Sequence, residues 1–254
     1  MRRFFTEPEN VDRENETLII YEDAGHIMKV LRMSCGDRIS VFDGSGYEYE
    51  TEITEISASC MNCRILNVQK SSLEPRTKVT LFQGIPKAGK LDVIVQKAVE
   101  LGVHKIVPVS CLRSVAKIPV GSRGANKIER LNKIAREAAK QCGRGLVPQV
   151  AEPVEFCDVI AALKSYDLSI MLYEELGHSG EKNLKQVLRS SSGAAAENIA
   201  VIIGPEGGIA REEADAFLEL GGETFAVGLG RRILRTETAG STALSIIMYE
   251  KDEI

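Results

Sequence analysis

The chain of 254 residues lacks both a net positive charge and a long apolar run. Its formal charge at pH 7 is −4, so no overall basic field draws it to nucleic acid, and any RNA contact must come from a local patch. The absence of 18 consecutive apolar residues argues against a membrane-spanning helix. The opening Met-Arg-Arg-Phe-Phe lacks the apolar core of a secretory signal. We therefore expect a soluble, cytoplasmic protein with no membrane partner.

Several catalytic and metal-binding signatures are also missing. The three histidines stand apart from any recognisable ligand spacing, and neither an HExxH nor a Ser-His-Asp pattern occurs. Cys60 and Cys63 form the one C-x-x-C pair among six cysteines, and no second pair lies nearby to complete a zinc site. We expect reduced, mostly buried thiols and no metal.

The composition and spacing predict two parts. With 44% apolar residues the chain can bury a real core. Residues 1–70 are rich in short strand patterns, at 17–20, 38–42, 47–53 and 61–68, with one helical pattern at 26–32. This favours a small barrel-like module. The polar, proline-containing stretch 71–75 is the candidate linker.

From residue 79 the pattern alternates between strand and helix. Apolar strands are predicted at 79–82, 106–109, 168–172, 199–203 and 224–227, and apolar helical stripes run through 91–101 and 128–142. Strands alternating with helices predict an α/β fold with a mostly parallel sheet and helices on both faces. The Ser- and Ala-rich stretch 190–196 is expected to be a loop.

Two glycine-bearing turns follow strands of this predicted sheet. The run 201–203 ends in Gly-Pro-Glu-Gly-Gly over 204–208, and the run 224–227 is followed by Gly228 and Gly230. Ligands bind at the carboxyl ends of parallel strands, where glycine lets backbone amides approach them. The alternative without a ligand is a tight strand-to-helix turn. Neither a Walker loop nor a dinucleotide fingerprint is present. The next helix starts with Ala210 where Ser or Thr would normally cap. Glu212 and Glu213 in its first turn would repel an anion, which favours a neutral or cationic ligand over a bare phosphate.

A second charged segment, 231–238, precedes an apolar helix. Its three arginines lie where the helix dipole disfavours cations, which points to an anionic partner. The alternative is an ordinary helix start capped by Thr236 or Thr238. The helix from about residue 126 also has a basic side. A solvated helix face is the common explanation, but with loop cations nearby it would offer the local patch that a phosphate backbone needs.

Five ordered motifs over 79–245 resemble the RsmE family of SPOUT methyltransferases. They are Gln-Gly-Ile-Pro-Lys at 83–87 with 96–102, Arg-Ser-Val-Ala-Lys at 113–117, the stretch 137–148, Gly-Pro-Glu-Gly-Gly at 204–208, and Ile-Leu-Arg-Thr-Glu-Thr-Ala at 233–239. The Phe4-Phe5 start and the β-rich lead resemble the family's PUA-like domain, so the resemblance covers nearly the whole chain. Ala210 and Lys140 depart from common family residues.

The resemblance implies a fold and an activity. Residues 1–72 would form a PUA-like RNA-binding β-barrel, and 73–254 a SPOUT α/β domain whose chain end threads a trefoil knot. The enzyme would use S-adenosylmethionine to methylate N3 of a uridine in 16S ribosomal RNA of the small subunit, as a homodimer with its site at the subunit boundary. Alternatives are methylation of another base or of a ribose 2′-hydroxyl, or a non-catalytic role in ribosome assembly.

By position, the resemblance also implies site residues. The catalytic candidates are Arg235 as a stabilising cation and Glu237 or Glu137 as the base. The cofactor would contact three loops: Leu172, Tyr173, Glu174, Ile203, Gly204, Pro205, Glu206, Gly207, Gly208, Gly228, Leu229, Gly230, Ile233, Leu234, Arg235, Thr238 and Ala239. RNA contacts are expected from Arg2, Arg3, Lys87, Lys90, Arg113, Lys117, Arg130, Lys133 and Arg144.

Overall fold

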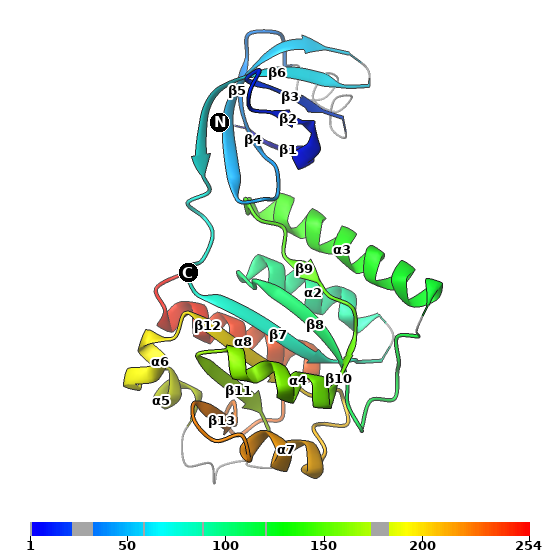
Figure 1. Cartoon of the computed structure of the whole chain (residues 1–254), viewed down its shortest axis with the longest axis vertical. Coiled ribbons are helices and arrows are strands. Elements are labelled where there is room, and N and C mark those ends of the chain that lie inside the picture. The colour runs from blue at the N-terminus through cyan, green and yellow to red at the C-terminus, as the bar shows by residue number, and fades with distance from the viewer. Residues whose placement is uncertain (1, 22–32, 58, 88, 120, 174–182) are drawn as a thin grey trace. The chain divides into compact units, whose positions relative to one another are not determined.

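The chain folds into two compact units in the computed structural model (Figure 1), which describes residues 2–21, 33–57, 59–87, 89–119, 121–173 and 183–254. One unit comprises Met1–Glu74 with Ala139–Val147, and the other Pro75–Ala138 with Pro148–Ile254. The helix predicted at 26–32 and the candidate cofactor residue Glu174 lie outside the described residues.

The N-terminal unit is a six-stranded sheet. Its described strands are β1 (Arg3–Phe5), β2 (Val11–Asp12), β3 (Thr17–Ile20), β4 (Arg38–Phe42), β5 (Tyr47–Ile56) and β6 (Met61–Lys70), in the order β1-β4-β5-β6-β3-β2, with the short 3-10 helix η1 (Pro8–Asn10) between β1 and β2. All four predicted strands are present. In β5 every second side chain is buried, namely Tyr49, Thr51 and Ile53, because alternate residues of a strand point to opposite faces. The core of the unit lies behind that face.

Residues 139–147 belong to this unit because they bond to it. Leu146 forms bridges to Gly44 and Ser45. Arg144, only 5% exposed, donates from Nε and Nη2 to the carboxylate of Glu74 at 3.2 and 2.7 Å, and the Leu146 amide donates to the same carboxylate at 3.0 Å. The sequence predicted a single domain boundary after residue 72 and did not indicate that residues 139–147 return to the N-terminal unit.

The second unit is built on a parallel sheet, as predicted. Its strands are β7 (Lys78–Gly84), β8 (Lys105–Ser110), β10 (Val154–Glu155), β11 (Leu168–Leu172), β12 (Asn198–Ile203) and β13 (Thr224–Val227), in the order β10-β8-β7-β12-β11-β13, with β9 (Gln149–Val150) also on β8. Every pair in this sheet is parallel. The five predicted strands are confirmed; β9 and β10, of two residues each, are too short to give a pattern. The knot stays an implication of the resemblance.

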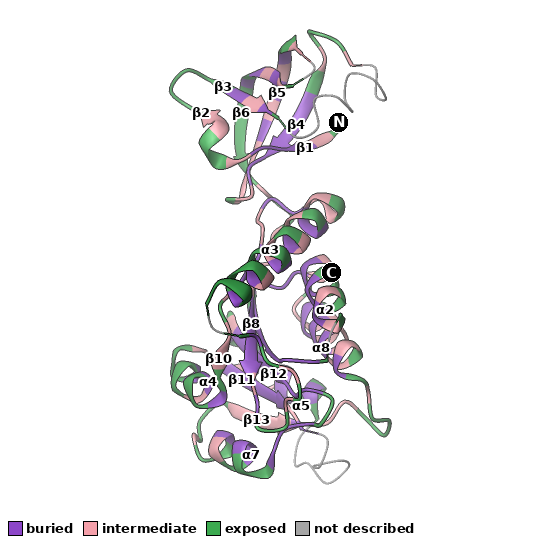
Figure 2. Ribbon diagram, turned by 90° about the vertical axis from the view of Figure 1, so that its right-hand side faces the viewer, coloured by how far each residue is buried: buried purple, intermediate pink, exposed green. Residues whose placement is uncertain are grey.

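Helices cover both faces of the sheet (Figure 1). The helical elements are α2 (Lys90–Glu100), α3 (Ser122–Cys142), α4 (Phe156–Ala162), η2 (Leu163–Ser165), α5 (Leu184–Leu188), α6 (Ser191–Ala195), α7 (Arg211–Leu218) and α8 (Thr236–Glu250). On one face Phe156 of α4 and Phe217 of α7 pack on Phe82, Val107 and Ile202 of the strands. Helices α2 and α8 pack together on the other face, so the strands between the layers are largely buried (Figure 2). Among the described helices, none combines the length and apolarity of a bilayer span.

The expected loop at 190–196 is instead the short helix α6. The Ser190 side chain caps it by accepting from the Gly193 amide at 3.1 Å. Lys251 Nζ donates to the carbonyls of Gly193, Ala194 and Ala196 at 2.7, 2.9 and 2.7 Å. Both ends of this helix are therefore satisfied by side chains, one of them from the far end of the chain, which composition alone did not reveal.

The cysteines are free thiols, but the expectation that most are buried is wrong. Cys63 and Cys111 are buried, and burial raises the pKa of their thiols to about 11 and about 12. Cys35 and Cys157 are exposed, and Cys60 and Cys142 are half-buried. The two buried thiols are held in the unreactive protonated form at neutral pH.

Candidate functional site

The carboxyl ends of β11, β12 and β13 lie side by side and open into one cavity. Leu172 of β11 is the register partner of Ile203 in β12 and of Val227 in β13, and these are the last residues of the three strands. The segments that follow the strands therefore start at one edge of the sheet. We call the segments after β12 and β13 the β12 loop (204–210) and the β13 loop (228–235). The cavity has a volume of about 570 Å³ and is lined by Lys90, Leu172, Tyr173, Ile203, Gly204, Pro205, Glu206, Gly208, Ile209, Val227, Gly228, Leu229, Gly230, Arg231, Arg232, Ile233, Leu234, Arg235, Thr236 and Ala239.

Close backbone packing explains the glycines of these loops. A Cβ on Gly204 would lie 2.9 Å from the carbonyl carbon of Gly208, and one on Gly84 would lie 2.6 Å from Pro205. Gly230 has open space around it but a φ of +106°, which side chains disfavour. The β12 loop thus requires glycine because its backbone is closely packed, and the β13 loop requires it because of its backbone conformation. Both loops expose main chain to the cavity.

Thr236 ties the cavity walls together. Its hydroxyl donates to the Gly204 carbonyl at 2.7 Å and accepts from Gln83 Nε2 at 2.9 Å, and both Thr236 and Gln83 are buried. The sequence offered Thr236 or Thr238 as the cap of α8; neither is. Arg235 occupies the cap position without a side-chain bond, and the Thr236 hydroxyl is used across the site instead.

A lysine with two carboxylates stands at the edge of the cavity. Lys90 Nζ lies 3.1 Å from Glu206 Oε1 and 3.2 Å from Glu237 Oε2. The Lys87 amide also donates to both oxygens of Glu206, at 3.1 Å each. The carboxylates, Glu206 first, raise the pKa of Lys90. Glu206 therefore does not offer a free negative charge to a cationic ligand, and Lys90 faces the cavity although the sequence grouped it with the RNA contacts.

The pKa of both carboxyls falls below the usual range. Burial alone would raise the pKa of Glu206, but hydrogen bonds from its own backbone, from Lys90 and from the Lys87 amide outweigh it. The pKa of Glu237 is lowered by a hydrogen bond from its own backbone and then by Lys90 and Arg235. Both groups are held as anions at neutral pH.

The outer side of the β12 loop is held by the segment after β8. Buried Glu213 accepts from the Ala210 amide at 3.0 Å and from the Leu112 amide at 2.8 Å, so it replaces the capping side chain that Ala210 lacks. Arg113 donates to the Gly207 carbonyl at 3.3 Å, and a Cβ on Gly207 would meet Arg113 at 3.1 Å. Gly207 therefore faces Arg113 and does not line the cavity.

Two further candidates fall outside the cavity lining. Thr238 is exposed because it lies two residues after Thr236, about 200° around the helix, whereas Ala239 returns to the cavity side. Glu137 is exposed on α3 and is not part of the lining. Of the two carboxylates proposed as a base, only Glu237 is brought to the site, through Lys90.

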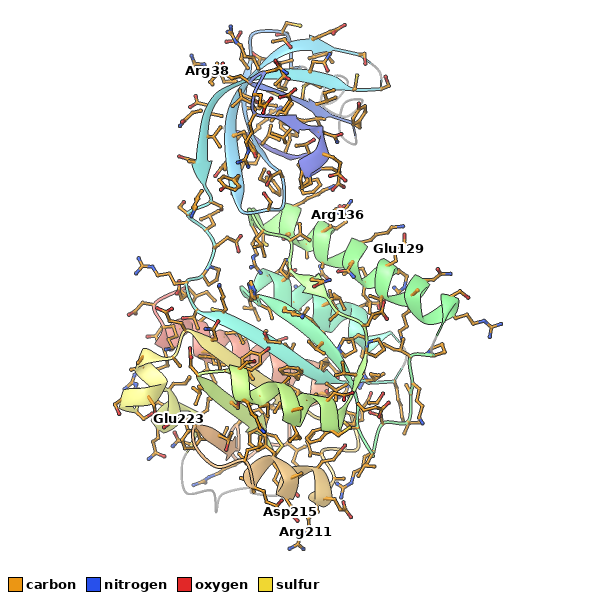
Figure 3. The ribbon with its side chains drawn as sticks, viewed as in Figure 1. Arg38, Glu129, Arg136, Arg211, Asp215 and Glu223 are labelled. Carbon is orange, nitrogen blue, oxygen red and sulfur yellow. The ribbon has the colours of Figure 1, made fainter. Side chains whose placement is uncertain are left out.

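Most of the predicted RNA-contact cations have acidic partners. Arg130 is bidentate to Asp92 at 2.6 and 2.7 Å, Lys133 pairs with Glu129 at 2.8 Å, and Arg3 lies 3.3 Å from Glu48. In Figure 3 Glu129 and Arg136 project from α3 on the side away from the sheet. Buried Arg144 serves packing and does not reach a surface. Arg2, Lys87, Arg113 and Lys117 are exposed, as are the paired Arg130 and Lys133.

Comparison with known proteins agrees with this arrangement. Residues 73–248 match a family described as an RNA methyltransferase domain, and 22–60 match an RNA methyltransferase PUA domain. A Bacillus subtilis protein named ribosomal RNA small subunit methyltransferase E is 34% identical, covering 99% of this chain and 98% of its own. The chain belongs to the ribosomal RNA small subunit methyltransferase E family.

Other members of this family match over most of their length. The Rickettsia conorii protein is 30% identical over 87% of this chain and 84% of its own. The crystal structure of the Neisseria gonorrhoeae member, bound to S-adenosyl methionine, is 29% identical, with a TM-score of 0.80 over 98% of this chain and 97% of its own. The predicted fold class, a parallel-sheet methyltransferase domain preceded by a PUA-like domain, is confirmed.

Proposed function

We propose that this protein transfers the methyl group of S-adenosylmethionine to N3 of a uridine in 16S ribosomal RNA of the small subunit. The observation that carries the proposal is the cavity between the β12 loop, the β13 loop and the start of α8, in a chain of this family. The solved relative from Neisseria gonorrhoeae, which is bound to S-adenosyl methionine, supports the choice of cofactor.

The cavity fits this cofactor. Its volume of about 570 Å³ falls within the range of about 300–1,000 Å³ usual for small-molecule sites. Leu172, Ile203 and Leu234 offer apolar surface to a nucleoside base, and the glycine-rich main chain offers donors and acceptors to its edge. When bound, the cofactor supplies an electrophilic methyl group on a positively charged sulfur. No fixed phosphate site is needed, in agreement with the acidic start of α7.

Arg235 is positioned to stabilise the target base. Uridine N3–H is a weak acid, and as the nitrogen loses its proton, negative charge spreads to the uracil oxygens. Arg235 lines the cavity and is exposed at the cap position of α8, which supports a role for its guanidinium and the positive end of the helix in stabilising that charge. Glu237 has a lowered pKa, which makes it a poor acceptor for a proton held this firmly. We therefore assign the main electrostatic contribution to Arg235, which by stabilising the uracil anion lets hydroxide from the solvent take the proton.

RNA would approach over the loops beside the cavity. Lys87, Arg113 and Lys117 are exposed on the segments that follow β7 and β8, and Arg113 is bonded to the β12 loop. Phosphate contacts from such cations position a substrate without reading its sequence. The N-terminal unit would hold flanking RNA, with exposed Arg2 as a candidate contact.

A second copy of the chain is the proposed partner. An apolar groove is lined by Leu184, Leu229, Ile246, Tyr249 and Ile254, among others, and it shares Gly228 to Gly230 with the cavity. Tyr249 and Ile254 are 68% and 69% exposed. Covering this groove with a second copy would place the subunit boundary beside the cofactor site. A ribosomal substrate would place the enzyme in the cytoplasm.

The test is methylation of small subunits from a strain that lacks the gene, followed by mass mapping of the modified nucleoside. Added mass on a ribose, or on another base nitrogen, would replace the N3 assignment. Arg235→Ala should lower turnover at saturating cofactor by about 10²–10³-fold with little change in cofactor affinity. Arg211→Ala is the matched control, because Arg211 is an exposed arginine of α7 paired with Asp215 (Figure 3). Unchanged turnover in Arg235→Ala would remove Arg235 from the mechanism.

A further inference from the structure

Lys90 is the cation that the two acidic groups at the cavity share. It begins α2, whereas Glu206 lies in the β12 loop and Glu237 in the first turn of α8. Its ammonium therefore joins three separate segments of the chain through the ion pairs at 3.1 and 3.2 Å. Each of these segments either lines the cavity or borders it.

The folding of α2 does not call for a lysine at this position. A cation at the first residue of a helix is opposed by the helix dipole, and α2 already has Asp92 in its first turn. The cap residue, Gly89, has a φ of 86° and no side chain that could bond to the helix start. The charge of Lys90 thus works against its own helix and is offset by Glu206 and Glu237.

Glu237 depends on Lys90 more than Glu206 does. Glu206 also accepts from the Lys87 amide, so it keeps a partner without the lysine. Glu237 accepts from its own backbone, but its buried Oε2 has, within the described part of the chain, the Lys90 ion pair and no hydrogen bond. The other cation acting on Glu237 is Arg235, two residues before it. Without Lys90, Arg235 is the cation that remains to act on Glu237.

We propose that Lys90 is a positioning residue that occupies Glu237 and so leaves the guanidinium of Arg235 available to the substrate. The lysine also keeps the β12 loop and the start of α8 in one arrangement through its ion pairs with Glu206 and Glu237. The catalytic part of this proposal rests on the proposed function, since it assumes that Arg235 acts on the target base. The pairing part concerns only this chain and is measurable without any substrate.

The kinetic test compares Lys90→Met, Lys90→Arg and the double variant Lys90→Met/Glu237→Gln. Lys90→Met should lower kcat about tenfold or more while the KM for cofactor changes much less, since a competing carboxylate would draw Arg235 away. Lys90→Arg, which keeps the charge, should stay within about threefold of wild type. The double variant should turn over faster than Lys90→Met, because the competing carboxylate is gone. A double variant as slow as, or slower than, Lys90→Met overturns the proposal.

Lys97→Met is the matched control. Lys97 lies on the same helix and pairs with Glu100 at 2.8 Å, away from the cavity lining. Its variant should keep wild-type kinetics. An equal loss of kcat in Lys97→Met would show that the effect of Lys90→Met comes from the stability of α2, and would overturn the assignment.

A spectroscopic arm separates this proposal from the proposed function. The Nε–H signal of Arg235, followed by NMR in the protein without cofactor, reports whether a carboxylate holds the guanidinium. Lys90→Met should slow exchange of this proton, and adding Glu237→Gln should restore the fast exchange. Unchanged exchange in Lys90→Met overturns the pairing, whatever the activity. If wild type methylates no small-subunit RNA while the exchange changes as expected, the function fails and the pairing stands.

Discussion

Replacing Thr236 by valine is expected to destabilise the C-terminal unit selectively. Valine keeps the shape of threonine but removes the hydroxyl that donates to Gly204 at 2.7 Å and accepts from Gln83 at 2.9 Å. A buried carbonyl left without its donor costs about 1–3 kcal/mol, and the loss of the glutamine bond adds about 0.5–1.5 kcal/mol, although Gln83 keeps its bond to Gly84. We expect the free energy of unfolding to fall by about 2–3 kcal/mol.

The effect is measurable by calorimetry. For a unit of this size, such a loss corresponds to a drop of roughly 4–12 °C in Tm. Thr236→Ser, which keeps the hydroxyl, should recover most of this loss, and the cofactor should bind Thr236→Val more weakly because the Gly204 wall loses its tie. A Tm for Thr236→Val within about 1 °C of wild type would refute the reasoning, since it would mean that neither partner needs the hydroxyl.

Two further predictions concern other parts of the molecule. Burial, and next the hydrogen bond to Asp43, raises the pKa of Tyr49 to about 12, so the neutral phenol stabilises the fold below pH 10 and this contribution disappears between pH 10 and 12. Tyr49→Phe should abolish that part of the loss of unfolding free energy at alkaline pH, as measured by urea titrations. An unfolding free energy that still falls with pH as in wild type would contradict the assignment. Tyr249→Glu, in the apolar groove, should convert a dimer to monomers in sedimentation experiments while the monomer stays folded, and a wild-type monomer at all concentrations would remove the dimer.

The strands were predictable because a buried strand requires apolar residues that are adjacent in the sequence. The run 168–172 matches β11 residue for residue, because a strand buried on both faces is mostly apolar and is bounded by turn residues. The run 224–227 matches β13, an edge strand whose side chains are mostly half-buried. The cavity walls were predictable for the related reason that glycine is required where backbones touch, as at Gly204.

Tertiary partners were not predictable. Nothing next to Lys90 in the sequence indicates that its carboxylates are 116 and 147 residues away, so the sequence groups it with the cations expected to contact RNA. The same holds for Arg130, whose charge is matched by Asp92. A count of lysines and arginines describes composition, whereas the charge offered to a phosphate depends on pairs that form only on folding.

The return of residues 139–147 to the N-terminal unit has a consequence for synthesis. Glu74 leaves the ribosome well before Arg144 and the Leu146 amide that it binds. Until that later stretch emerges, the edge at Gly44 and Ser45 lacks its bridge and the carboxylate lacks its cation. The N-terminal unit, whose translation begins first, is thus completed only after β7, β8 and α3 have been translated, so the order of synthesis and the order of completion differ.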